Sequence, residues 1–180
     1  MAASQRRWGW HQLDAGWANR LVADACIAPG SVVLEVGAGV GALTAPLVAA
    51  GARVIAVEAH PERARHLCED FGDAIVVVQA DAGDLRLPRR PYHVVSNPPF
   101  GVTAALLRRV LQPGSRLLSA HVILQEQAAR RWARSRAPGV RRWGRTFEAS
   151  IGLRVPRSAF RPRPHVDTRV LVIRRRFRAG

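Results

Sequence analysis

The sequence predicts an α/β fold built on an open, mostly parallel sheet within one domain. Short runs of β-branched residues alternate with helical segments through the first two thirds of the chain. Hydrophobic residues make up 48% of the 180 residues, which is enough for one substantial core. Glycine-rich and acidic turns follow the predicted strands, and in parallel sheets such turns gather at one edge. We therefore expect a ligand site at the carboxyl ends of the strands.

Seven segments are predicted to be strands. The first four are short and rich in valine and isoleucine, as buried parallel strands are; they span residues 31–36, 53–58, 74–79 and 92–96. Three later strands are predicted at residues 118–124, 147–155 and 168–176. The last two of these have an alternating apolar and polar character.

Five segments are predicted to be helices. One precedes the first strand and the others lie between later strands, at residues 17–27, 41–51, 60–70, 101–112 and 125–135. Pro29-Gly30 and Gly51 mark boundaries between elements. The sequence contains no repeat, long linker or second compact unit. We expect a single domain over residues 1–180, with an N-terminal arm at 1–16 and a basic tail at 177–180.

Composition excludes several classes of protein. The chain is 23% charged with a mean hydropathy of −0.05, which argues against disorder. No apolar run approaches the ~20 residues of a transmembrane helix, and the opening residues lack the apolar stretch of a signal peptide. Two cysteines, Cys26 and Cys68, are too few for a disulfide framework and suit the cytoplasm. The six histidines are scattered, so we expect no metal site.

Charge is distributed unevenly along the chain. Residues 1–90 hold nine arginines and ten acidic residues, whereas residues 91–180 hold nineteen arginines and three acidic residues. All 28 basic residues are arginine. A GC-rich genome would explain the missing lysine but not this asymmetry, and arginine matches phosphate oxygens well. The pattern predicts a nucleic-acid partner, with the seven arginines of 130–145 as the best phosphate contacts or, alternatively, a solvated helix face.

Glycines and acidic residues follow the first three predicted strands. The first strand runs into a turn that contains Gly37, Gly39 and Gly41, which would let a ligand lie against the main chain. The second strand ends in Glu58, whose carboxylate suits the two hydroxyls of a ribose. Asp81 follows the third strand and could accept from a purine amine. Each acid could instead be a helix cap or loop charge, but the three ends together favour a nucleoside cofactor.

The fourth strand ends in Asn97, Pro98, Pro99 and Phe100. The prolines stiffen the backbone and remove two N–H donors, which leaves the Pro98 carbonyl and the Asn97 side chain as neighbouring acceptors. Two acceptors in a rigid frame would hold an NH₂ group, and Phe100 could stack on its planar system. Hydrogen bonds through both N–H groups draw the nitrogen lone pair out of conjugation, so this end favours methyl transfer to a planar nitrogen.

These motifs, in this order, resemble a known family. EVGAGVG, AVE, ADAGDL and NPPF are similar to motifs of class I S-adenosylmethionine-dependent methyltransferases that act on planar amines. In the second half, QEQAARRWA, RTFEASIGLRVPRSAF and RPRPHVDTRVLVIRR resemble the erythromycin-resistance (Erm) ribosomal RNA adenine N6-methyltransferases, relatives of the KsgA/Dim1 dimethyltransferases. The run VPRSAFRPRPHVDTRV is the most specific part. The resemblance covers roughly residues 10–176.

The resemblance implies a Rossmann-like methyltransferase fold, with seven mostly parallel strands and helices on both faces. It implies an rRNA (adenine-N6)-methyltransferase that uses S-adenosyl-L-methionine, modifies 23S rRNA in the large ribosomal subunit or its precursor, and confers resistance to macrolide, lincosamide and streptogramin antibiotics. We expect a cytoplasmic monomer that needs neither metal nor membrane.

Individual roles follow from matching motifs. The implied cofactor-binding residues are His11, Leu13, Glu35, Gly37, Gly39, Gly41, Glu58, Ala59, Asp81, Ala82 and Asn97. The implied catalytic residues at the target adenine are Asn97, Pro98 and Phe100. The charge pattern adds the RNA-binding candidates Arg130, Arg131, Arg134, Arg141, Arg142, Arg174 and Arg175.

The sequence departs from the family at two places. The opening Gln-Asn-Phe-Leu motif of the family appears here as Trp10-His11-Gln12-Leu13. Typical members continue into a helical C-terminal domain, whereas this chain stops at Gly180, as in the short mycobacterial representative. We expect the arginines of 130–145 and 174–178 to compensate for the missing RNA contacts, and adenines beside the main target to be methylated too.

Other functions remain open. A protein N-methyltransferase acting on glutamine or another side chain would use a similar Asn-Pro-Pro turn, but the basic second half argues against it. Enzymes that act on small-subunit rRNA or on DNA share the same site chemistry. A non-catalytic RNA-binding relative would not need Glu58, Asp81 and Asn97, whose presence favours an enzyme.

Overall fold

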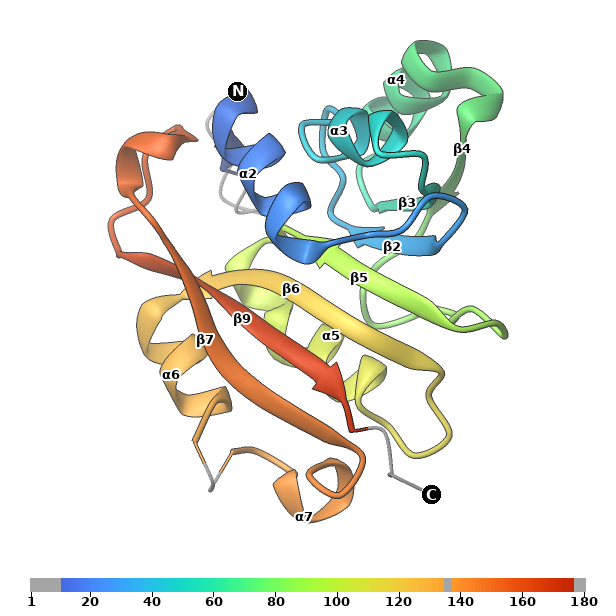
Figure 1. Ribbon diagram of the computed structural model, residues 1–180. Coiled ribbons are helices and arrows are strands. Elements are labelled where there is room, and N and C mark those ends of the chain that lie inside the picture. Colours follow the sequence, from blue (N-terminus) through green and yellow to red (C-terminus); the bar gives the residue numbers. More distant parts are fainter. Residues whose placement is uncertain (1–10, 135–136, 177–180) are drawn as a thin grey trace.

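The computed structural model describes residues 11–134 and 137–176, which form a central seven-stranded sheet (Figure 1). Its strand order is β4-β3-β2-β5-β6-β9-β7. The strands span β2 (Val32–Val36), β3 (Arg53–Glu58), β4 (Ile75–Gln79), β5 (Tyr92–Ser96), β6 (Leu117–Gln125), β7 (Phe147–Val155) and β9 (Thr168–Arg175). The first five strands in this order are parallel, and β9 pairs antiparallel with β6 and β7. The predicted α/β fold and all seven predicted strands are confirmed.

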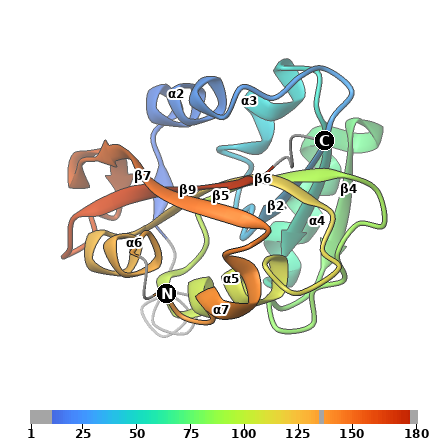
Figure 2. The same cartoon turned by 60° about the horizontal axis from the view of Figure 1, so that its bottom comes forward.

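Helices cover both faces of the sheet (Figures 1 and 2). One face packs against α2 (Ala15–Ala25), α3 (Thr44–Ala49) and α4 (Pro61–Phe71), and the other against α5 (Thr103–Val110), α6 (Glu126–Trp132) and α7 (Val140–Trp143). Each layer encloses its own buried apolar cluster, because the parallel strands present apolar side chains in both directions. Short 3₁₀ turns lie at η1 (Gly72–Ala74), η2 (Phe100–Val102) and η3 (Arg157–Ala159).

The helix predicted at 41–51 begins three residues later, at Thr44. Gly41 has a φ of +85°, a conformation that only glycine adopts without strain, so residues before Thr44 form a turn. A Cβ at Gly41 would lie 2.6 Å from the Phe71 ring, which shows how closely this turn approaches α4. The glycine therefore serves packing between the turn and the helix.

A second, two-stranded sheet was not predicted. Here β1 (Gln12–Leu13) pairs antiparallel with β8 (Phe160–Arg161), and the Asp14 amide donates to the Ala159 carbonyl at 2.7 Å. Leu13 and Phe160 are only 3% and 1% exposed, so the small sheet is anchored in the core. Of the predicted arm at 1–16, residues 1–10 lie outside the described residues and α2 already begins at Ala15; the predicted tail at 177–180 is likewise not described.

The arginine-rich segment forms two short helices rather than one. The helix predicted at 125–135 ends at Trp132, and α7 follows after a turn. The rings of Trp132 and Trp143 stack with centroids 6.3 Å apart, and the Trp143 indole N–H donates to the Pro138 carbonyl at 2.9 Å. Both tryptophans are buried, so they attach α6 and α7 to the sheet. Within the described ranges, no helix is long and apolar enough to span a membrane.

Candidate active site

The ends of β2, β3 and β5 are joined by hydrogen bonds at one edge of the sheet. The amides of Gly37 and Ala38 donate to the Val57 carbonyl at 2.8 and 3.2 Å, which connects the turn after β2 to β3. The Ser96 hydroxyl donates to the Val36 carbonyl at 2.6 Å and connects β5 to β2. As expected for parallel strands, the motifs that follow these strands lie together.

Gly37 packs directly against the turn that follows β5. Its φ is +74°, and a Cβ on this residue would lie 3.0 Å from Pro99 Cδ and 3.3 Å from Pro98 Cα. A side chain at this position would separate the glycine-rich turn from the Asn-Pro-Pro turn. The glycine thus allows two strand ends, which are 60 residues apart in sequence, to form one continuous wall.

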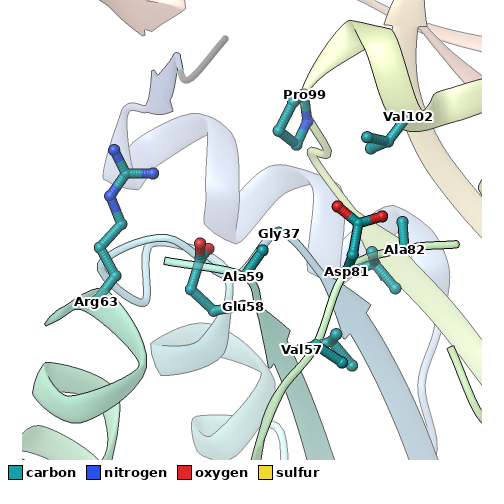
Figure 3. A pocket seen from close by; sticks show the side chains of 11 residues that line it. Gly37, Val57, Glu58, Ala59, Arg63, Asp81, Ala82, Pro99 and Val102 are labelled. Atoms are coloured by element: carbon teal, nitrogen blue, oxygen red, sulfur yellow. The ribbon is translucent and has the colours of Figure 1, made fainter. Parts of the chain in front are cut away.

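The first pocket at this edge is partly open to solvent. Figure 3 shows the carboxylates of Glu58 and Asp81 extending into it from neighbouring strand ends, below Pro99 and Val102. Its wall combines these acceptors with apolar groups; the lining residues are Val36, Gly37, Val57, Glu58, Ala59, Arg63, Ala80, Asp81, Ala82, Pro99 and Val102. Such a mixture suits a flat, partly polar molecule.

Backbone amides hold the Glu58 carboxylate in place. The Gly39 amide donates to Oε2 and the His60 amide donates to Oε1, both at 2.8 Å, and Glu58 is buried. Each carboxylate oxygen has a second lone pair, so Glu58 can still accept hydrogen bonds from a ligand. Asp81 is exposed, and its Oδ1 accepts from the Gly83 amide at 2.9 Å. Both acids therefore combine a local structural contact with remaining acceptor capacity.

A second pocket shares Gly37 with the first. It contains Glu35, which is only 1% exposed and accepts from the Thr44 hydroxyl at 2.7 Å. Burial, together with the nearby charge of Glu58, raises the pKa of Glu35 to about 8, although the Thr44 hydrogen bond acts in the opposite direction. A cationic ligand group here would stabilise the ionised carboxylate. The lining residues are His11, Gln12, Leu13, Glu35, Gly37, Ala38, Val40, Ala42, Leu43 and Asn97.

The Asn97 side chain has a defined orientation. Its Nδ2 lies 2.8 Å from the His11 carbonyl oxygen, and because a carbonyl can only accept, the amide nitrogen must face His11. Oδ1 is then directed away from His11 as an acceptor. Among residues 11–134 and 137–176, none donates a hydrogen bond to the Pro98 carbonyl, which is a second acceptor next to it. Phe100 is half-buried, with its ring centroid 5.7 Å from that of His11.

Most of the residues predicted for cofactor binding line the two pockets. Those that do are His11, Leu13, Glu35, Gly37, Glu58, Ala59, Asp81, Ala82 and Asn97. Gly39 instead holds Glu58, and Gly41 packs on Phe71, so these two glycines shape the site indirectly. Two further pocket residues were not predicted, namely Arg63 and Val102; they belong to no motif and reach the pocket from α4 and η2.

The predicted RNA-binding arginines have different environments. Five are exposed on the two-helix segment, namely Arg130, Arg131, Arg134, Arg141 and Arg142. Arg130 forms an ion pair of 2.7 Å with Glu126. Arg174 is exposed, whereas the Arg175 guanidinium donates to the carbonyls of Ser115 and Leu117 and lies over the Phe147 ring. Because β9 pairs with the beginning of β6 here, both lie at the edge opposite the pockets.

Two exposed arginines beside the site were not predicted. Arg161 pairs with Gln12 in the small sheet, and Arg163 follows two residues later, so both lie near His11. The signal that could have identified them is the family-specific run VPRSAFRPRPHVDTRV, in which both occur.

The chain is similar in sequence to RNA methyltransferases and to a resistance protein. The chain is 40% identical over 146 residues to an rRNA adenine N-6-methyltransferase of Corynebacterium diphtheriae, which is 79% of this chain and 57% of that protein. It is 38% identical to the mycinamicin-resistance protein MyrB of Micromonospora griseorubida (91% and 53%), and 37% identical to ribosomal RNA small subunit methyltransferase A of Anaeromyxobacter dehalogenans (79% and 57%). The chain therefore spans somewhat more than half the length of these relatives.

A solved structure gives the same result. The 23S rRNA methyltransferase ErmE superimposes with a TM-score of 0.81 at 30% identity, over 91% of this chain and 68% of ErmE. The family model described as ribosomal RNA adenine dimethylase matches residues 12–179, which include the glycine-rich turn, the two acids and the Asn-Pro-Pro-Phe turn. The sequence-based resemblance is thus confirmed, and the chain belongs to the ribosomal RNA adenine dimethylase family.

Proposed function

We propose that this protein transfers methyl groups from S-adenosylmethionine to N6 of an adenine in 23S rRNA and thereby confers resistance to macrolide, lincosamide and streptogramin antibiotics. The observation that carries the proposal is the meeting of two pockets at Gly37, directly beside the acceptor oxygens of Asn97 and Pro98. A donor molecule and an acceptor amine would meet there.

The residues of the two pockets fit S-adenosylmethionine. In the first pocket, Glu58 offers acceptors for the ribose hydroxyls, and Asp81 offers one for the adenine amine. In the second, the buried carboxyl of Glu35 suits the ammonium group of the methionine part. Gly37 lines both pockets, so the sulfonium between the two parts would lie close to its backbone. When bound, this cofactor supplies an electrophilic methyl group whose transfer leaves a neutral thioether.

The acceptor residues hold and polarise the target amine. Asn97 Oδ1 and the Pro98 carbonyl accept from the two N6–H groups, which draws the lone pair out of the adenine ring and toward the donor. The backbone of the Pro98-Pro99 turn is stiff and packs on Gly37, so these acceptors stay in place. One N6 proton passes to water after transfer. The neutral leaving group means that alignment, rather than a strong base on the protein, supplies the rate enhancement.

The RNA substrate must present its adenine outside the helical stack, because N6 is unreachable in paired RNA. Phe100 offers an aromatic surface for that base at the mouth of the site. The exposed arginines Arg161 and Arg163 beside His11, and those of α6, would contact the flanking phosphates. We place the reaction on the large ribosomal subunit or its precursor, carried out by a monomer in the cytoplasm.

A second candidate substrate is 16S rRNA, because a small-subunit methyltransferase is among the relatives at 37% identity. The similarity to MyrB at 38% and to ErmE at 30% supports 23S rRNA.

Methyl transfer from labelled S-adenosylmethionine tests the proposal. Purified protein is incubated with 23S rRNA, 16S rRNA and ribosomal particles, and primer extension locates the modified adenines. We expect label in an adenine of the peptidyl-transferase loop of 23S rRNA, lost in Asn97→Ala and retained in Asn19→Ala. Asn19 is a matched control because it is the other asparagine of the chain and its amide donates to Ala15 on α2. Label in 16S rRNA alone would favour the second candidate, and no label in any RNA would overturn both.

A further inference from the structure

We propose that His11 is a positioning residue that fixes the Asn97 carboxamide and the Phe100 ring at the methyl-acceptor site. This inference rests on the proposed function and goes beyond it, because His11 was expected to contact the cofactor and the family carries a different residue at this place in its motif. His11 touches both side chains that would hold the target adenine, although it is 86 residues from Asn97 in sequence.

A chain of two hydrogen bonds runs through His11. Its backbone carbonyl accepts from Asn97 Nδ2 at 2.8 Å, and its ring Nδ1 lies 2.7 Å from the Pro162 carbonyl. Since that carbonyl can only accept, Nδ1 must be the donor. The bond to Pro162 holds the main chain of His11 at the position from which its own carbonyl accepts from Asn97.

The orientation of Asn97 depends on this contact. A carboxamide can be turned over at almost no steric cost, and the reversed orientation would present N–H donors where the target amine needs an acceptor. The His11 carbonyl removes this ambiguity because it bonds only to the NH₂ end. The hydrogen bond thereby selects the rotamer in which Oδ1 is available to the adenine.

The small sheet makes His11 a rigid support. Residues 12 and 13 pair with Arg161 and Phe160, and the Asp14 amide donates to the Ala159 carbonyl at 2.7 Å. Leu13, the second residue of β1, is buried in the core. His11 is thus attached on both sides, by β1 through the backbone and by Pro162 through the ring.

The His11 ring also contacts Phe100. The two ring centroids are 5.7 Å apart with an interplanar angle of 33°, a tilted arrangement within the favourable range for aromatic pairs. This contact limits the rotation of Phe100, whose other surroundings leave it half-buried. A rigid Phe100 would receive a flipped base with a smaller entropic cost than a mobile one.

Three substitutions separate the two contacts of the His11 side chain. His11→Ala removes both, His11→Phe keeps a ring without a donor, and His11→Asn keeps a donor near the Nδ1 position without the ring. We expect His11→Ala to lower kcat for methyl transfer about 10- to 100-fold, with the Kd for S-adenosylmethionine changed less than about threefold. His11→Asn and His11→Phe should each recover part of kcat. Loss of cofactor affinity with kcat unchanged would overturn the proposal.

Nuclear magnetic resonance tests the hydrogen bonds without catalysis. In ¹⁵N-labelled protein, neutral His11 should be the Nδ1–H tautomer, and the Asn97 side-chain amide, assigned by its absence in Asn97→Ala, should be protected from solvent exchange. Protection should fall in His11→Ala and return in His11→Asn. Unchanged protection in His11→Ala would refute the positioning role. A wild-type protein that methylates no RNA but shows these signals would refute the proposed function and leave the hydrogen-bond chain established.

Discussion

Replacing Glu35 with glutamine tests the charge state of the most deeply buried acid of the site. The carboxyl is 1% exposed, and burial raises its pKa from 4.5 to about 8. Glutamine keeps an acceptor for the Thr44 hydroxyl, which lies 2.7 Å away, and has nearly the same shape. The substitution therefore removes the ionisable proton while it preserves the local hydrogen bond.

The raised pKa sets the sign and size of the effect. Because the folded protein holds the proton more tightly than the unfolded chain, Glu35 contributes its stability fully below pH 4.5 and loses it as the pH rises toward 8. Each unit of pKa difference corresponds to about 1.4 kcal/mol. Between pH 4.5 and pH 7 the wild-type protein should lose about 3 kcal/mol of unfolding free energy through this group, whereas Glu35→Gln should lose none.

Urea unfolding of both proteins at several pH values measures this difference, since all other titrating groups are common to both and cancel. We expect the stability of Glu35→Gln relative to wild type to increase by about 3 kcal/mol from pH 4.5 to pH 7. A difference that stays constant with pH would refute the assigned pKa.

The proposed function predicts that the same carboxyl links cofactor binding to proton release. With a pKa of about 8, Glu35 is mainly protonated at pH 7, and a bound ammonium group would drive it to ionise. Calorimetric titration with S-adenosylmethionine in buffers of different ionisation enthalpy should show release of close to one proton by the wild type and none by Glu35→Gln. Equal proton release by both would place the ammonium away from Glu35.

Three further predictions concern the rest of the chain. Arg175→Met should cost about 1–3 kcal/mol of unfolding free energy, because the Arg175 guanidinium donates to two backbone carbonyls. Arg174 is exposed, so Arg174→Met should leave stability unchanged and reduce the salt dependence of RNA binding. Equal effects of the two substitutions on stability would contradict this assignment. Burial lowers the pKa of His121 from 6.5 to about 4. Unfolding free energy should therefore fall by about 3 kcal/mol through this group as the pH drops from 6.5 to 4. His121→Phe should abolish this contribution, as measured by acid titration followed by circular dichroism. Gly41→Ala should lower the urea midpoint of unfolding more than Gly30→Ala does. Both glycines have positive φ, but only a Cβ at residue 41 would collide with the Phe71 ring. Equal urea midpoints for the two variants would show that the Phe71 ring moves aside without cost.

Much of the fold could be predicted because local sequence carries the information. Runs such as VVLEV and RVIAVE are apolar on both faces, which is the signature of buried parallel strands, and the structure places strands there. The positions of Glu58 and Asp81 in the first pocket followed from the same reasoning, since the carboxyl ends of parallel strands share one edge. These inferences needed only the alternation of strands with helices and the residues at each strand end.

Contacts between residues that are far apart in sequence could not be predicted and were seen only in the folded structure. The pairing of β1 with β8 involves two residues on each side, too few to leave a pattern, yet it brings His11 to Pro162 and Asn97. The environments of two neighbouring arginines in β9 could not be predicted either. Side chains alternate across a sheet, so Arg174 faces solvent whereas the Arg175 guanidinium donates to backbone carbonyls. Local patterns specify which elements form and which face of each is apolar, whereas contacts between loops depend on how the whole sheet is ordered and twisted. For that reason the fold class, the family resemblance and the positions of Glu58 and Asp81 at one edge of the sheet could be predicted from sequence, whereas the contact that orients the Asn97 side chain was seen only in the packed structure.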